Sequence, residues 1–89
     1  MERDRIKSFT DRFMVDGRLT TIPRREKDRE AMRLYFAAKF DENTSYTEEE
    51  VNSILLEFYS DYAYLRRELI DHGLMKRTAA GDFYHLSRG

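Results

Sequence analysis

Residues 46–73 have the sequence YTEEEVNSILLEFYSDYAYLRRELIDHG, which contains the signals of two short helices joined by a tight corner. Thr47 and Glu50 have the spacing of a capping box, in which Thr47 accepts from a free amide and the Glu50 carboxylate reaches back to Thr47. Apolar residues then recur at the i, i+3, i+4, i+7 spacing of one helical face, namely Val51, Ile54, Leu55 and Phe58. The stretch therefore predicts a helix that begins directly after Thr47.

A second helix is predicted after the corner at residues 59–61. Its apolar residues have the same helical spacing and are Tyr62, Leu65 and Leu69. Gly73 is expected to end this helix in a Schellman motif, in which Leu74 would contact Leu69. Two short helices joined in this way predict a helix-turn-helix.

The first 22 residues predict an additional helix and a short strand. Residues 4–13 have amphipathic spacing, with an apolar edge formed by Ile6, Phe9 and Phe13. We expect this edge either to pack on the domain or to form a homodimer with a second copy of the chain. A turn at residues 16–17 and a strand at residues 18–22 follow, and Pro23 is placed to be the first residue of the next helix.

That next helix is expected to bury an apolar stripe that includes Met32, Phe36 and Phe40. After Gly73, residues 74–77 and 83–87 predict a two-stranded hairpin, which is the wing of a winged helix. We therefore predict an α+β fold, a winged helix-turn-helix with an extra N-terminal helix and a short strand. The 89 residues fit one domain, with residues 1–22 as an N-terminal helix and hairpin-like extension and residues 23–89 as the winged-helix core.

The composition limits the classes of partner. Sixteen Lys and Arg residues face 17 Asp and Glu residues, so the net charge of −1 argues against a generally basic nucleic-acid coat. The cations are nevertheless unevenly placed, because residues 34–61 contain one Lys and seven acids. The absence of Cys excludes disulfides and thiolate metal sites. No apolar run has the length of a membrane span or a signal peptide, so a soluble cytoplasmic protein without a membrane partner is expected.

Several segments resemble the bacterial domain of unknown function 2087. They are Phe13–Leu19, Ile22-Pro23, Phe40, Tyr46–Asn52, Asp61–Leu69, Asp71–Arg77 and the Tyr84 strand. The Asp-Tyr-Ala-x-Leu-Arg-Arg run at residues 61–67 is the most specific part of this resemblance. The resemblance implies a winged-helix module that occurs alone or attached to transcriptional regulators and acyltransferases. The resemblance supports a role in regulation only through the regulators to which such modules are attached. It transfers no catalytic residue to this chain.

The predicted second helix of the pair supplies the candidate DNA-binding residues. At 100° per residue, Tyr64 and Arg67 fall on the outward arc, with Arg66 beside them and with Ala63 and Asp71 on the same arc. Arg67 is expected to bond guanine in the major groove, Arg66 a phosphate, and Tyr64 a sugar or phosphate.

Basic residues outside this helix are expected to add phosphate contacts. Near the wing these are Lys76 and Arg77, and at the start of the preceding helix they are Arg24, Arg25 and Lys27. The predicted partner is therefore double-stranded DNA, in bacterial transcriptional regulation.

The alternative is a protein–protein interaction module with a winged-helix fold and no nucleic-acid binding. In that case Arg66 and Arg67 would pair with nearby acids, for which the candidates are Glu57, Asp61, Glu68 and Asp71. An enzyme is not expected, because no serine lies in a nucleophile elbow and no Gly-rich phosphate loop is present. His72 and His85 lack metal-site spacing, so neither a metal nor a cofactor is predicted, and His72 is expected at a helix end.

Overall fold

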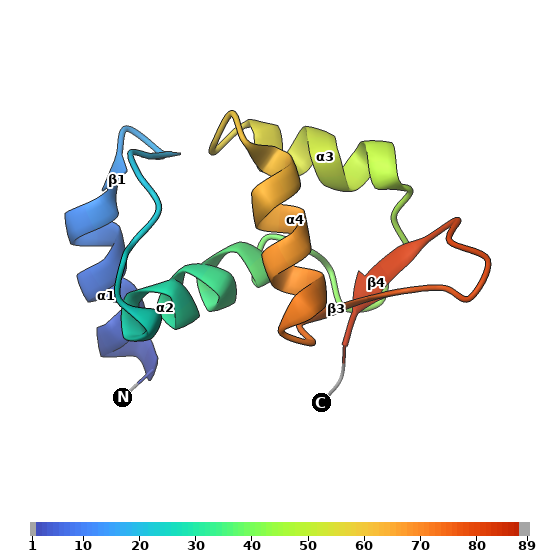
Figure 1. Ribbon diagram of the computed structural model, residues 1–89, viewed down its shortest axis with the longest axis horizontal. Helices are drawn as coiled ribbons and strands as arrows, with labels where there is room; N and C mark the ends of the chain where they lie inside the picture. Colours follow the sequence, from blue (N-terminus) through green and yellow to red (C-terminus); the bar gives the residue numbers. More distant parts are fainter. Residues whose placement is uncertain (1, 88–89) are drawn as a thin grey trace.

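The computed structural model describes residues 2–87, which form four helices and two small antiparallel sheets (Figure 1). The helices are α1 (Glu2–Phe13), α2 (Glu26–Ala37), α3 (Glu48–Leu56) and α4 (Tyr62–Asp71). The first sheet pairs β1 (Met14–Val15) with β2 (Arg18–Leu19), and the second pairs β3 (Met75–Arg77) with β4 (Tyr84–Leu86). The predicted α+β class is therefore confirmed.

The helices connect the two sheets, which lie at opposite ends of the molecule (Figure 1). α1 packs on α2, α2 packs on α4, and α3 packs on α4. One core of buried side chains runs through these contacts and consists of Phe9, Leu19, Ala31, Met32, Phe36, Phe40, Val51, Leu55, Leu65, Leu69, Met75 and Tyr84. None of the helices within residues 2–87 combines the length and the apolar content needed to cross a lipid bilayer.

The apolar edge of α1 packs on the rest of the domain. Phe9 is fully buried, and its ring lies 5.8 Å from the rings of both Phe13 and Tyr35. Phe13 is half-buried and contacts the same core. Of the two expectations for this edge, the structure shows the intramolecular one.

The local signals at both ends of the helix pair are confirmed. The Glu50 amide donates to the Thr47 hydroxyl at 3.1 Å, and the Thr47 amide donates to the Glu50 carboxylate at 2.8 Å. Gly73 has a φ of 75° after α4. The Leu74 amide donates to the carbonyl of Leu69 at 2.9 Å and the Gly73 amide to that of Ile70 at 3.1 Å, which is the bond pattern of a Schellman motif.

Pro23 is not the first residue of α2, contrary to the expectation from sequence. Arg25 is the N-cap, with an extended backbone, and the helix begins at Glu26. The guanidinium of Arg29 donates to the carbonyls of Pro23 and Arg24. These two carbonyls accept from a side chain and not from backbone amides of the helix, so residues 23–24 lie outside α2. Pro23 is buried in this position.

The strand expected over residues 18–22 is also shorter, because Leu19 turns toward the end of α3. Its amide donates to the carbonyl of Phe58 at 2.8 Å. The neighbouring Arg18 guanidinium donates to the carbonyl of Glu57 at 2.8 Å. The β1–β2 hairpin is thereby attached to the corner between α3 and α4.

Tyr46 connects the second sheet to the start of α3. It forms an isolated antiparallel bridge with Tyr84, in which the Tyr46 amide donates to the Tyr84 carbonyl at 2.8 Å and the reverse bond measures 2.7 Å. The β3–β4 hairpin therefore lies beside the N-terminus of α3.

Candidate nucleic-acid interface

The orientation of α4 is set by its leucines. Leu65 and Leu69 are each 1% exposed and face the core, as their spacing predicts. Arg67 and Asp71 lie on the exposed side. Within residues 2–87, the Arg67 side chain makes no hydrogen bond or ion pair. Arg67 is therefore available to a partner.

Arg66 is turned toward α3. Its guanidinium donates to the Oδ1 atom of Asn52, and the side chain is half-buried. None of the acids proposed from the sequence holds Arg66 in an ion pair. Asn52 has this role instead, because α3 packs beside this face of α4.

Glu48 lies between the cations of α4 and β3. The buried Tyr84 donates its hydroxyl to Glu48 Oε1 at 2.5 Å. This bond, followed by the positive charge of Arg66 and more weakly that of Arg77, lowers the pKa of Glu48. The Tyr84 hydroxyl and, to a smaller extent, Glu48 raise the pKa of Arg77. Positive charges from two different elements, Arg66 of α4 and Arg77 of β3, thus both lower the pKa of this carboxylate.

Lys76 lies on the opposite face of the hairpin from Arg77. In the observed register Lys76 is opposite His85 and Arg77 is opposite Tyr84. Successive residues of a strand point to opposite faces of a sheet, so the face that carries Tyr84 and Arg77 does not include Lys76. Lys76 is exposed, but it is not part of the group around Glu48.

Tyr64 does not lie on the outward arc where the helical periodicity placed it. It is half-buried and packs against the core, and this burial raises the pKa of its hydroxyl, with a smaller effect from Glu68. The reason is that α2 packs against this side of α4. An isolated helix leaves this position free, whereas the tertiary contact covers it.

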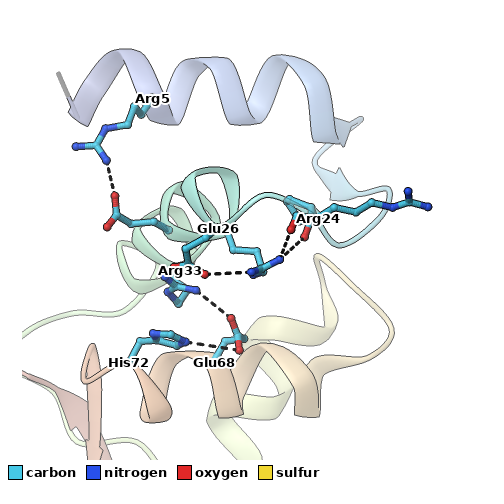
Figure 2. Close-up of polar contacts among 9 residues, drawn as sticks. Arg5, Arg24, Glu26, Arg33, Glu68 and His72 are labelled. Atoms are coloured by element: carbon cyan, nitrogen blue, oxygen red, sulfur yellow. Dashed lines mark hydrogen bonds and ion pairs between the residues drawn. The ribbon is translucent and has the colours of Figure 1, made fainter.

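Ion pairs hold α4 against α2 on that covered side (Figure 2). Arg33 is 5% exposed and its guanidinium reaches Glu68 Oε1 at 3.1 Å and also the Glu26 carboxylate. The bond from Arg33 is the main cause of the lowered pKa of Glu26. His72, the C-cap residue of α4, places its Nε2 atom 3.9 Å from Glu68 Oε2. Glu68 therefore faces α2 and not the side that carries Arg67.

The five residues predicted for DNA binding thus fall into separate groups. Arg66 and Arg77 both affect the pKa of Glu48, and Arg67 lies on the exposed side of the helix. Lys76 is on the other face of the hairpin, and Tyr64 is on the α2 side. Glu48, Asn52 and Tyr84 were not predicted from the sequence as neighbours of the cations. The three consecutive glutamates signalled only a helix start, and nothing local indicated which of them would contact the hairpin.

The comparisons with known proteins give a family match. Residues 18–86 match the model of a family described as "Uncharacterized protein conserved in bacteria (DUF2087)". No curated protein and no solved structure matches the chain. The matched residues include β2, α2, α3, α4 and the β3–β4 hairpin. The chain therefore belongs to this family of uncharacterised bacterial proteins.

Proposed function

We propose that this protein is a winged-helix protein that binds double-stranded DNA in the bacterial cytoplasm, as part of transcriptional regulation. The order of the elements supports this proposal: α2, the bridging Tyr46, α3, α4 and the β3–β4 hairpin follow one another. In this interpretation α4 enters the major groove and the hairpin is the wing. The central observation is the exposed Arg67 on α4, which has no ion-pair partner among the described residues, combined with the pairing of Glu68 with Arg33.

The roles of the cations follow from their surroundings. Arg67 has the freedom to form a bidentate contact with guanine, which discriminates by about 1–3 kcal/mol. Arg66 and Arg77 are suited to phosphates, because guanidinium groups bond anionic oxygens and both charges already act on the Glu48 carboxylate. Lys76 would contact a phosphate from the other face of the hairpin. Tyr64 is left out of the proposed interface because it packs against the core.

Fluorescence anisotropy with a mixed-sequence DNA duplex tests the proposal. Binding is expected at micromolar protein in low salt and is expected to weaken as salt rises, because phosphate contacts release counterions. Arg67→Glu should weaken binding by about tenfold or more. Arg3→Glu is the charge-matched control, since Arg3 is exposed on α1 at the other end of the molecule (Figure 1). Absence of binding in low salt, or equal binding by the Arg67 variant, would contradict the proposal.

A second candidate function is protein–protein interaction. Within residues 2–87, three large apolar side chains are exposed, with exposed fractions of 59% for Val15, 48% for Leu56 and 44% for Phe83. A homodimer through α1 would need residues other than Phe9, because Phe9 is fully buried. Pull-down from a bacterial lysate after nuclease treatment separates the two functions. A partner that Leu56→Ser loses and that survives nuclease treatment favours protein interaction.

A further inference from the structure

A second group of cations lies between α1 and the start of α2, at the opposite end of the molecule from the β3–β4 hairpin (Figure 1). A cavity of about 310 Å³ is present there. Four cations line it. Arg5 and Arg12 belong to α1, Arg25 directly precedes α2, and Lys27 lies in the first turn of α2. Arg24 lines an adjoining hollow that shares Arg12 and Arg25 with the cavity. Cations from separate segments are therefore brought to one concave surface.

Most acids around this cavity are already neutralised. Asp28 is 8% exposed, and both of its carboxylate oxygens accept from Arg12, with Oδ2 at 3.1 Å from Nη1. The bonds from Arg12 are the main cause of the lowered pKa of Asp28. Glu30 is paired with Arg5. Asp4 is the one cavity-lining acid in the described part of the chain that has no such partner.

The remaining cations of the cavity are not bonded to an acid, although the charges of Arg25 and Lys27 help to lower the pKa of the nearby Asp28. The side chains of Arg24, Arg25 and Lys27 make no hydrogen bond or ion pair with any residue that the structure describes. Figure 2 shows the Arg24 side chain pointing away from the ion pairs that connect α2 and α4. In the cavity, Arg25 and Lys27 therefore lie near Asp4 and near Asp28, whose carboxylate oxygens are already bonded to Arg12. The local excess of cations over acids in the lining is hidden by the net charge of −1.

The backbone adds two donors beside these side chains. Arg25 is the N-cap of α2, and its side chain does not cap the helix. The first backbone hydrogen bonds of the helix are donated by the amides of Asp28 and Arg29, and both amides donate to the Arg25 carbonyl. The amides of Glu26 and Lys27 have no acceptor within residues 2–87. Free amides at this end of a helix favour an anion.

We propose that this cavity binds a phosphate group, held by Arg25 and Lys27 with Arg24 at its rim. Guanidinium groups bind phosphate oxygens in a bidentate manner, and lysine contributes a point charge. The ligand class is a phosphate monoester or a backbone phosphate of nucleic acid. This site is separate from the proposed DNA face on α4, because its residues belong to the α1–α2 end of the molecule.

NMR titration of the ¹⁵N-labelled full chain with inorganic phosphate tests the proposal. The titration is performed at one fixed pH near neutrality, where inorganic phosphate is an anion, and sodium chloride keeps the ionic strength constant. Saturable shifts of the Glu26 and Lys27 amides are expected. Arg25→Gln with Lys27→Gln should weaken the phosphate affinity read from these two amides by about tenfold or more, whereas Arg66→Gln with Arg67→Gln should leave the affinity read from the same two amides unchanged. The dispersion of each variant's spectrum verifies its fold.

Two further titrations identify the source of the phosphate. Shifts of the same amides with phosphoserine identify a small monoester, and shifts with a short DNA duplex identify the nucleic-acid backbone. Shifts that sodium chloride alone reproduces, or an unchanged affinity in the Arg25/Lys27 double variant, would overturn the proposal. Because Arg66 and Arg67 are not needed for this site, it can fail while the proposed DNA binding stands, and the reverse also holds.

Discussion

The polar residues on the two sides of α4 differ in how far their neighbours occupy them. On the side that faces α2, Glu68 is paired with the nearly buried Arg33 and Tyr64 is packed against the core. On the exposed side, Arg67 has no partner within residues 2–87, and Arg66 is held only by the neutral Asn52. The comparison shows that packing neighbours, and not the residue types alone, decide which charges remain available for binding.

The largest expected effect comes from breaking the buried side. Leu69→Ala should lower the free energy of unfolding by about 2–5 kcal/mol, because it leaves a cavity in the core. Chemical denaturation measures this change through the midpoint at a constant m value. Asp71→Ala, on the exposed side, is the control and should stay within about 0.5 kcal/mol. Equal effects of the two changes would mean that α4 is rotated relative to the described arrangement.

A smaller effect is expected from the ion pair between α4 and α2. Glu68→Gln should lower the free energy of unfolding by about 1–3 kcal/mol, because it removes one of the charged partners of the nearly buried Arg33. Arg33 keeps its bond to Glu26, which limits the loss. Glu57→Gln serves as the control in the same denaturation experiment, since Glu57 is exposed. A stability equal to that of the unmodified chain would show that Glu26 alone compensates Arg33.

The smallest expected effect concerns the availability of the cations near the hairpin. Glu48→Gln should tighten binding of duplex DNA by about threefold to fivefold in low salt, because the carboxylate no longer competes with phosphate for Arg66 and Arg77. Glutamine still accepts from the Tyr84 hydroxyl, so the fold should be retained. Glu49→Gln, at the exposed neighbouring residue, should have a smaller effect in the same anisotropy assay. Identical affinities for the two variants would exclude this role of Glu48.

The parts of the fold that follow from nearby residues were predictable from the sequence. The capping box at Thr47 and the helix end at Gly73 depend on residues within one or two helical turns, and both are confirmed. The register of the β3–β4 hairpin and the Tyr46–Tyr84 bridge depend on contacts between distant segments. No local pattern specifies them, although the hairpin itself was expected.

The candidate site was less predictable, because its electrostatics depend on neighbours from other elements. Arg66 contacts a residue 14 positions earlier, and Glu68 contacts one 35 positions earlier. Helical periodicity places side chains around one axis, but it does not say which arcs a second helix covers. Tyr64 was therefore predicted to face outward, and the packing of α2 covers it instead.

The packing of α1 has a consequence for how the molecule can be divided. The family match starts at residue 18, after α1 has ended at Phe13. Phe9 nevertheless contacts Tyr35, whose ring lies 5.1 Å from that of Phe36 in the centre of the core. A chain trimmed to the matched segment would leave these aromatic rings open to water and prone to self-association. The buried core of this protein therefore extends beyond the segment that matches the family model.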